Sequence, residues 1–484
     1  MSTTRSRPTP GPRHAPRTGP ILSCLTLLGA LALTACSEDA AAPAPAAGDP
    51  AYVAVPSPAA VPSATADPLA AAKAAPDVVQ GLRRVLQQRA SAISGGDQQA
   101  FRAGLAGDPS FRSQQSQYFE NLRQLPLQVF ALTSDPATIV RDGSSYRVNV
   151  RVTLQLDGYD AVPVTTVDRY LFTTRPQGGR LRLSSVTDAA WEARNQVQSQ
   201  PWDAGPVVVR AGVGVLGVFD PGSVASADRL VASLEQGLTA VSAVVPYPWS
   251  RTVVVYALSD GAFLNSIPDL PGGEADDLDA VAFPVLADTV ADAASGPSVV
   301  AGTRLALNPR MLGRAGPGRD RLLRHELTHA AVGVHDNHAP TWLGEGLAEY
   351  VSVQAEPPEL RRVQPDALAA AEAGFTDLPR DRGFYDQDAA AHYGLSWWAC
   401  EYVAATAGPA AVWSLLDQLE AAGVQSPQGV ADRARQDAVL LAVGGANART
   451  LARKAGKLLV TTFAPPPAVT PTPAPTDPVA PGAP

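Results

Sequence analysis

Lysine is nearly absent from this chain of 484 residues, and its overall charge is negative. Lysine occurs only at Lys73, Lys454 and Lys457, and the formal net charge at pH 7 is -8. Affinity for nucleic acid depends on clustered positive charge that neutralises phosphates, and no arginine-rich stripe replaces the missing lysines. The composition therefore excludes nucleic acid as a main partner.

Cysteine is also scarce, with three residues in the whole chain. Cys24 and Cys36 lie close to the N-terminus, so the body of the chain contains only Cys400. A single cysteine cannot form an internal disulfide, which excludes a disulfide framework. Cys400 ends the apolar run Trp397–Cys400, so we expect a small buried side chain there rather than a nucleophile.

Long apolar runs are missing beyond the N-terminal leader. No later segment reaches the roughly 18 consecutive apolar residues that a membrane-spanning helix needs. The leader itself has four arginines between Arg5 and Arg17, followed by the apolar segment 21–35. This arrangement is typical of a secretory signal peptide, which we assign to residues 1–35.

The leader ends in Leu33-Thr34-Ala35-Cys36, which resembles the lipobox of bacterial lipoproteins. The resemblance implies that the thiol of Cys36 is diacylated and that Cys36 becomes the first residue of the mature chain. We therefore expect a lipid-anchored protein on the extracytoplasmic face of the cell membrane. Ordinary cleavage near Ala35 is the alternative.

Two segments lack the large apolar residues that a core needs. Residues 36–75 are rich in Ala, Pro and Ser, and residues 465–484 are rich in Pro and Thr. Such compositions cannot bury enough apolar surface to offset the entropy of folding. We expect a disordered stalk and a disordered tail.

The first folded unit is expected at 76–202. Apolar residues at helical spacing open it, and four runs with apolar alternation follow, separated by turns at Asp142-Gly143 and Gly178-Gly179. This order of helices before an antiparallel sheet resembles the NTF2-like α+β cone. No catalytic cluster occurs in it, so a structural or partner-binding role is expected.

The second folded unit is expected at 207–464, after a linker at 198–205. Its first half has strand-like runs at 207–218, 252–258 and 302–309, a helix at 224–244 and a loop-rich acidic stretch at 261–298. From Asp320 the pattern is mostly helical. The whole chain is therefore predicted to be α+β.

The second unit contains the motif His325-Glu326-Leu327-Thr328-His329 inside a predicted helix at 319–334. Residues four apart share one face of a helix, so His325 and His329 can bind one metal ion. Glu326 is offset by one residue, beside the metal and free to act on its water. The spacing predicts a catalytic zinc site with one ion per chain.

A second segment, Trp342 to Tyr350, resembles the stretch that carries the third zinc ligand of gluzincin metallopeptidases, the M1 aminopeptidases in particular. The resemblance implies a zincin-like fold with Glu345 as metal ligand. In thermolysin-like members an acid four residues later orients the first histidine, which corresponds to Glu349 acting on His325. Glu349 stays open as the alternative ligand, because the interval between His329 and Glu345 is shorter than in those families.

The M1 resemblance extends to Tyr393, which implies that its hydroxyl stabilises the oxyanion of the tetrahedral intermediate. His392 is the alternative donor for that role. His335 and His338 are expected in a loop near the site without binding metal. The strand Arg304–Leu307 is expected at the edge of its sheet, where an extended peptide could add to it.

The sequence thus predicts a zinc metallopeptidase that acts on peptide or protein substrates. Two alternatives remain: a cell-surface binding lipoprotein with a non-catalytic zinc domain, and a zinc hydrolase of non-peptide amides or esters. The choice between endopeptidase and exopeptidase and the oligomeric state stay open.

Overall fold

A computed structural model describes residues 74–174, 179–268, 270, 275–288, 299–423 and 433–463. The predicted leader, residues 36–73 of the predicted stalk, Cys36 included, and the predicted tail lie outside these residues. The described chain has an α+β fold, as expected, with one antiparallel sheet, one mixed sheet and many helices. Among the described helices, none combines the length and apolar character needed to cross a membrane.

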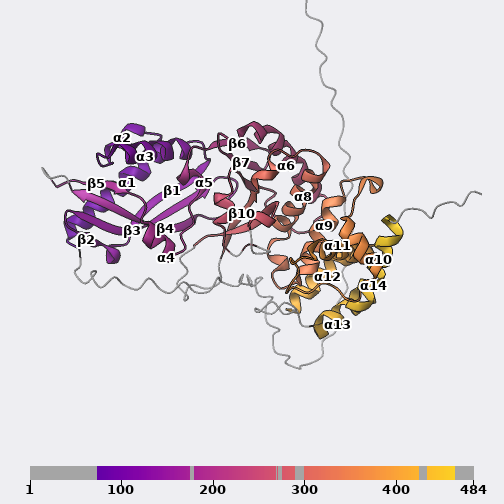
Figure 1. Cartoon of the computed structure of the whole chain (residues 1–484). Coiled ribbons are helices and arrows are strands. Elements are labelled where there is room, and N and C mark those ends of the chain that lie inside the picture. Colours follow the sequence, from indigo (N-terminus) through magenta and orange to yellow (C-terminus); the bar gives the residue numbers. More distant parts are fainter. Residues whose placement is uncertain are drawn as a thin grey trace, which may run out of the picture. The chain divides into compact units, whose positions relative to one another are not determined.

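Helices open the N-terminal region, and an antiparallel sheet follows them. The helices are α1 (Pro76–Gly95), α2 (Gln98–Ala103) and α3 (Pro109–Leu122). Asp97 and Asp108 cap α2 and α3 by accepting hydrogen bonds from the backbone N–H groups of Ala100 and Phe111. Figure 1 shows these helices along one side of the sheet, which they cover with apolar side chains.

The strands of this sheet lie in the order β1-β3-β4-β5, and the short β2 pairs with β3. All of these pairings are antiparallel. Their bounds are β1 (Leu127–Ser134), β2 (Val140–Asp142), β3 (Ser145–Leu156), β4 (Val164–Thr174) and β5 (Leu181–Ser185). The predicted order of helices and strands in 76–202 is therefore found.

The segment expected as a linker is packed against α3 instead. It contains α5 (Pro201–Ala204), which follows α4 (Ala189–Arg194), and the side chain of Trp202 is buried. The side-chain amide of Asn121 donates to the carbonyl oxygens of Trp202 and Gly205 and accepts a hydrogen bond from the N–H of Val207. These contacts fix the connection because Asn121 is itself almost fully buried.

The second sheet has the strand order β6-β7-β8-β10-β9. The strands are β6 (Val208–Gly212), β7 (Val215–Phe219), β8 (Val253–Ala257), β9 (Ala280–Leu286) and β10 (Val300–Leu307). The three central strands are parallel, whereas β6 and β9 pair antiparallel with them. Helix α6 (Ala227–Ser242) provides the crossover between β7 and β8.

Two strand predictions for this sheet are wrong. The single run 207–218 is a hairpin, because the chain turns at Val213-Gly214, where Gly214 has a φ of 75°. The strand Arg304–Leu307 is not at the edge: β10 lies between β8 and β9. Strand β9, inside the stretch expected to be loop-rich, forms the edge next to β10.

The two faces of the second sheet belong to different cores. Side chains such as Leu216, Val254 and Tyr256 join the core of the N-terminal region. Their neighbours in the strands, such as Val215 and Val255, join the core formed with the later helices. Both faces are covered, which explains why these central strands are apolar at nearly every position.

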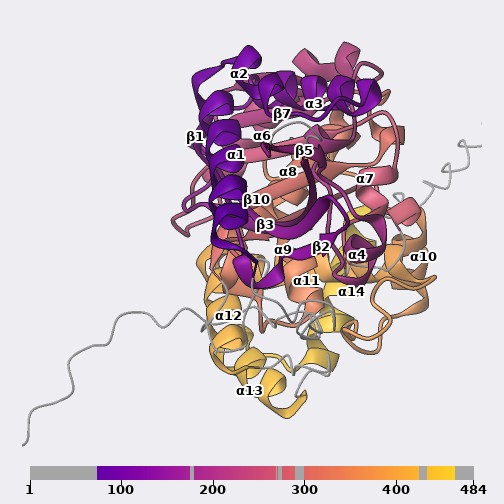
Figure 2. The same cartoon turned by 90° about the vertical axis from the view of Figure 1, so that its left-hand side faces the viewer.

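The C-terminal half is helical, as predicted. After the short α7 (Ala262–Asn265) and the later strands come α8 (Pro317–Val332), α9 (Thr341–Val353), α10 (Pro365–Ala373), α11 (Ala389–Ala407), α12 (Pro409–Ala421), α13 (Arg433–Gly444) and α14 (Ala448–Phe463). Figures 1 and 2 both show α9 beside α11. Gly346 permits this approach, since a Cβ atom there would lie 2.6 Å from the carbonyl oxygen of Ser396. Cys400, on α11, is buried as expected.

Candidate metal centre

Two neighbouring helices bring three metal-binding side chains together. His325 and His329 lie one turn apart on α8, and Glu345 lies on α9, which packs against α8. The Nε2 atoms of the two histidines are 3.2 Å apart, and Oε2 of Glu345 lies 3.2 Å from Nε2 of His325 and 3.4 Å from Nε2 of His329. Together these residues form a group that could hold a metal ion.

The triangle formed by these three atoms has the size of a tetrahedral metal site. Donor atoms about 2.0–2.1 Å from zinc, at tetrahedral angles, are separated from one another by about 3.3 Å. The three observed separations agree with this value. The spacing of the donor atoms is therefore compatible with one metal ion held by all three residues.

Charge and burial support the same assignment. Oε2 of Glu345 is buried and has no hydrogen-bond partner, although it faces two imidazoles. Burial favours the neutral acid, but the imidazoles, His329 foremost, hold the pKa of Glu345 well below its usual range. The result is a buried carboxylate with a free oxygen, which a cation would stabilise.

Glu349 lies behind His325 rather than beside the two Nε2 atoms. Its Oε1 is 3.1 Å from Nδ1 of His325, and its Oε2 accepts a hydrogen bond from Arg321. Burial opposes the charge of Glu349, but His325 and Arg321 lower its pKa to about 2. The geometry thus places Glu345 at the metal position and Glu349 where it can orient the imidazole.

Glu326 is buried near these charged side chains, and the edge strand β9 holds its carboxylate. The backbone N–H of Ala282, on β9, donates a 2.7 Å hydrogen bond to Oε2 of Glu326. Burial raises the pKa of Glu326, and the neighbouring imidazoles partly offset that rise. A carboxylate held in this way could accept a proton beside the metal position.

Tyr385 is a site residue that sequence reasoning missed. It lies in the connection between α10 and α11, and its hydroxyl donates a 2.6 Å hydrogen bond to Oε1 of Glu345. Burial and the charge of Glu345 raise the pKa of Tyr385 far above its usual value, so it keeps its proton. No spacing rule marks this residue, because only the folded connection brings it to the site.

Tyr393 lies in the second turn of α11 rather than at its start. Its ring centroid is 6.0 Å from that of His325, and among the described residues its hydroxyl has no hydrogen-bond partner. Burial and Glu345 raise the pKa of Tyr393 far above its usual value. The hydroxyl of Tyr393 therefore keeps its proton and is free to donate a hydrogen bond.

The other three histidines in the described part of the chain have different surroundings. Nδ1 of His392 is 2.7 Å from the carbonyl oxygen of Phe384, so this nitrogen is already engaged. The ring of His335 stacks on Tyr247, and Nδ1 of His338 pairs with Glu420 at 2.7 Å. His335 and His338 lie in and just after a 3-10 turn at Gly333–Asp336, near α8.

No known family model matches the chain, and neither a curated protein nor a solved structure matches it.

Proposed function

We propose that this chain is a zinc metallopeptidase with His325, His329 and Glu345 as its metal ligands. The observation that carries the proposal is the triangle of donor atoms with sides of 3.2, 3.2 and 3.4 Å. A second carboxylate, that of Glu326, lies beside it, as hydrolysis requires.

Each residue around the metal position has its own role in the proposed hydrolysis. Zinc, when bound, supplies a Lewis acid that polarises the scissile carbonyl and lowers the pKa of a water molecule to about 7. Glu326 accepts the proton of the attacking water and passes it to the leaving amine. Glu349 holds His325 in the tautomer that carries its proton on Nδ1, which leaves Nε2 free to bind the metal.

The developing oxyanion needs a hydrogen-bond donor. Tyr393 fits this role better than His392, because the Tyr393 hydroxyl is unengaged while Nδ1 of His392 is held by Phe384. Tyr385 is committed to Glu345 and serves to position that ligand. We therefore assign oxyanion stabilisation to Tyr393.

Strand β9 supports a peptide rather than another amide as substrate. It is the edge of its sheet, and through Ala282 it contacts Glu326 directly. An extended peptide that adds to this edge would place its main chain next to the proposed catalytic base. Main-chain pairing of this kind accepts many sequences.

The test is to count zinc in the purified chain and in His329→Ala, Glu345→Ala and a control variant, His335→Ala. The parent and the control are expected to hold one zinc per chain, and the two ligand variants to hold none. Zinc content that is indifferent to the ligand variants contradicts the site.

Digestion of a peptide library by the zinc-loaded parent then tests the reaction. Cleavage that disappears in Glu345→Ala supports the peptidase. If small esters or amides are hydrolysed and no peptide is cleaved, the peptidase proposal gives way to a non-peptide hydrolase. Absence of both would favour a binding lipoprotein.

The location of the protein is a separate proposal that rests on the leader. Cys36 is proposed to carry the lipid anchor, which places the metal centre on the extracytoplasmic face of the membrane. Residues 76–202 are proposed to form an NTF2-like unit, supported by the order of helices and strands. Mass spectrometry of the mature N-terminus, beside Cys36→Ala, checks the anchor.

A further inference from the structure

A second chemical feature lies in the N-terminal region, away from the metal centre. A cavity of about 290 Å³ opens between α3, strands β3 and β4, and the segment that contains α4 and α5. Val285 of β9 and Arg304 of β10 also line it. Cavities of this volume, at the small end of the usual range, are typical of binding sites for small molecules.

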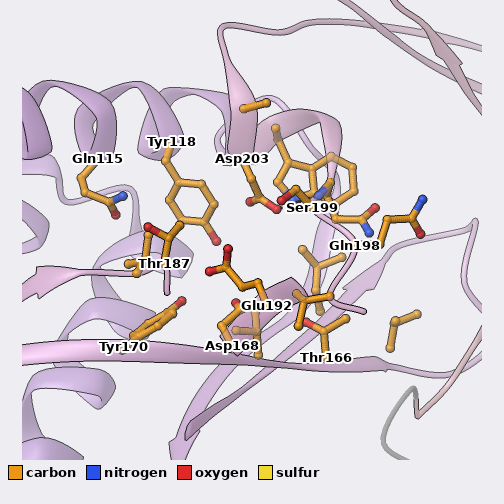
Figure 3. A pocket seen from close by; sticks show the side chains of 18 of the residues that line it. Gln115, Tyr118, Thr166, Asp168, Tyr170, Thr187, Glu192, Gln198, Ser199 and Asp203 are labelled. Atoms are coloured by element: carbon orange, nitrogen blue, oxygen red, sulfur yellow. Dashed lines mark hydrogen bonds between the residues drawn. The ribbon is translucent and has the colours of Figure 1, made fainter. Parts of the chain in front are cut away.

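One part of the cavity gathers three carboxylates and two phenols (Figure 3). Asp168 comes from β4, Glu192 from α4 and Asp203 from α5. In Figure 3 the hydroxyls of Tyr118 and Tyr170 point toward Glu192 and Asp168. Side chains from four separate elements therefore converge on one polar region.

No cationic side chain that the structure describes pairs with the three carboxylates of this region, although Glu192 and Asp203 each accept a backbone N–H, from Asp188 and Gln200. Among the described residues, Asp168, Glu192 and Asp203 form no ion pair. Arg304 is committed to Asp160, with Nη2 and Oδ1 2.6 Å apart. Arg89, the other cation of the lining, lies over the ring of Phe101 and donates to Gln115.

The phenols give an independent sign of a missing ligand. The side chain of Tyr170 is only 4% exposed and lines the cavity, and its hydroxyl has no hydrogen-bond partner in the described part of the chain. A ligand that enters the cavity can therefore form a hydrogen bond with this hydroxyl.

Part of the remaining lining is apolar, and polar side chains such as Gln114, Thr166 and Gln198 make up the rest. Val152 and Leu154 of β3, Val164 of β4 and Val285 of β9 contribute aliphatic side chains, and Trp202 adds an indole ring. The lining is thus amphipathic, with acid and phenol groups in one region and hydrocarbon in another. This division selects for a ligand with one polar group and an apolar body.

We propose that this cavity binds a small organic cation, namely a protonated amine attached to an apolar body. The ammonium group lies among Asp168, Glu192 and Asp203 and donates hydrogen bonds to them, while the apolar body contacts the valines. The phenol oxygens of Tyr118 and Tyr170 add hydrogen-bond acceptors for the ammonium group. This proposal does not depend on the metallopeptidase.

The electrostatics of the empty cavity agree with a cation site. Burial, reinforced by the charges of Asp203 and Glu192, raises the pKa of Asp168 to about 7. Burial likewise raises the pKa of Asp203 to about 6. A bound ammonium would lower both pKa values, because its positive charge favours the ionised carboxylates.

The experiment is a calorimetric titration of the full chain with three probes of matched shape: 2-phenylethylamine, 2-phenylethanol and 3-phenylpropionate. The amine is expected to bind at least about tenfold more tightly than the other two, since only the ammonium forms hydrogen bonds with the carboxylates in which both partners are charged. Equal binding of the alcohol or the carboxylate, or no binding of the amine at millimolar concentration, overturns the proposal.

Variants locate the amine. Asp168→Asn and Asp203→Asn should each weaken its binding about tenfold or more, because an amide offers no net charge to the ammonium. Asp157→Asn, a change at an exposed aspartate outside the cavity, should leave binding unchanged. Thermal unfolding of every variant confirms that it is folded.

Two further variants complete the test. Tyr170→Phe removes one hydroxyl from the lining and is expected to weaken binding while the fold is kept. Glu345→Ala, at the metal centre, is expected to bind the amine as the parent does. Binding that survives both aspartate variants, or that is lost in Glu345→Ala, would show that the amine does not bind in this cavity.

Discussion

The hydroxyl of Tyr385 donates a 2.6 Å hydrogen bond to Oε1 of Glu345, while Oε2 of the same carboxylate faces Nε2 of both His325 and His329. One oxygen is therefore held by the protein and the other is left free for a metal ion. The phenol fixes the rotation of the carboxylate about its last bond. It also stabilises the charge of Glu345 by a hydrogen bond to the ionised form.

Replacement of Tyr385 by Phe removes this hydrogen bond and leaves the ring in place. We expect zinc affinity to fall about 10–100-fold, since residues that orient a ligand commonly contribute this much. Competition with a chromophoric chelator measures the affinity. Tyr402→Phe, on the far part of α11, is the matched control and should bind zinc as the parent does. Unchanged affinity in Tyr385→Phe would mean that the phenol does not position Glu345.

Glu326→Gln is expected to keep zinc and lose turnover by a factor of about 10² or more, because the amide cannot accept the proton of the attacking water. The side chain keeps its shape and can still accept the hydrogen bond from Ala282. Zinc stoichiometry and the rate on any peptide that the parent cleaves are measured together. The control is Glu372→Gln, at an exposed position on α10. Full activity in Glu326→Gln rules out this residue as the base.

The buried ion pair between Asp160 and Arg304 predicts a large effect on stability. Their side chains are 0% and 3% exposed, and Oδ2 of Asp160 also accepts the N–H of Leu156. Asp160→Asn should lower the free energy of unfolding by about 3–5 kcal/mol, because it leaves the guanidinium buried without a counter-charge.

Denaturant unfolding of Asp160→Asn, Arg304→Met and the double variant measures the coupling between these two side chains. The double variant is expected to be more stable than Asp160→Asn alone, since no uncompensated charge remains. Asp157→Asn, at an exposed position nearby in sequence, serves as the reference for a harmless loss of charge. Additive losses in the double variant would contradict a coupled pair.

Asp168 predicts how stability changes with pH. Its pKa is raised to about 7 in the folded state, so the folded chain holds this proton more tightly than the unfolded chain. This tighter binding of the proton contributes at most about 4 kcal/mol to the free energy of unfolding. The contribution is complete below pH about 4 and is lost as the pH rises to about 7. Water that reaches the carboxylate of Asp168 inside the cavity reduces this free-energy contribution, because it solvates the ionised form.

The difference between the parent and Asp168→Asn isolates this contribution from other titrations. The charged and titratable groups around it are Asp203, Glu192, Tyr118, Tyr170, Arg89 and Arg304. Relative to the parent, the variant should gain stability between pH 4 and 7, measured by urea unfolding at each pH. A difference that does not change with pH would contradict the raised pKa.

The sequence predicts the centre of the metal site well, because that part depends on local helical geometry. His325 and His329 share a helix face through their spacing alone, and Leu323 and Leu327 mark the opposite, buried face. Glu345 and Glu349 are likewise four residues apart on one helix. Their separate positions, one at the histidine Nε2 atoms and the other behind His325, follow from how α9 packs on α8.

The residues that escaped prediction depend on contacts between distant segments. Tyr385 reaches Glu345 only because the connection before α11 folds back over the site. Strand β9 was not predicted because it lies in a stretch with many acidic and small residues. It is ordered by pairing with β10, which comes later in the chain. The cavity was missed because Asp168, Glu192 and Asp203 have no common spacing in the sequence.

The second sheet, which contributes one face to each of the two cores, has a consequence for dividing the protein into fragments. A fragment that starts at 207 would expose Leu216, Val218, Val254 and Tyr256 to water, all of which are almost completely buried in the intact chain. Such an apolar surface promotes self-association. The N-terminal region therefore covers one face of the sheet whose other face packs on the helices of the metal-binding half, and we expect the two halves to melt in a single transition.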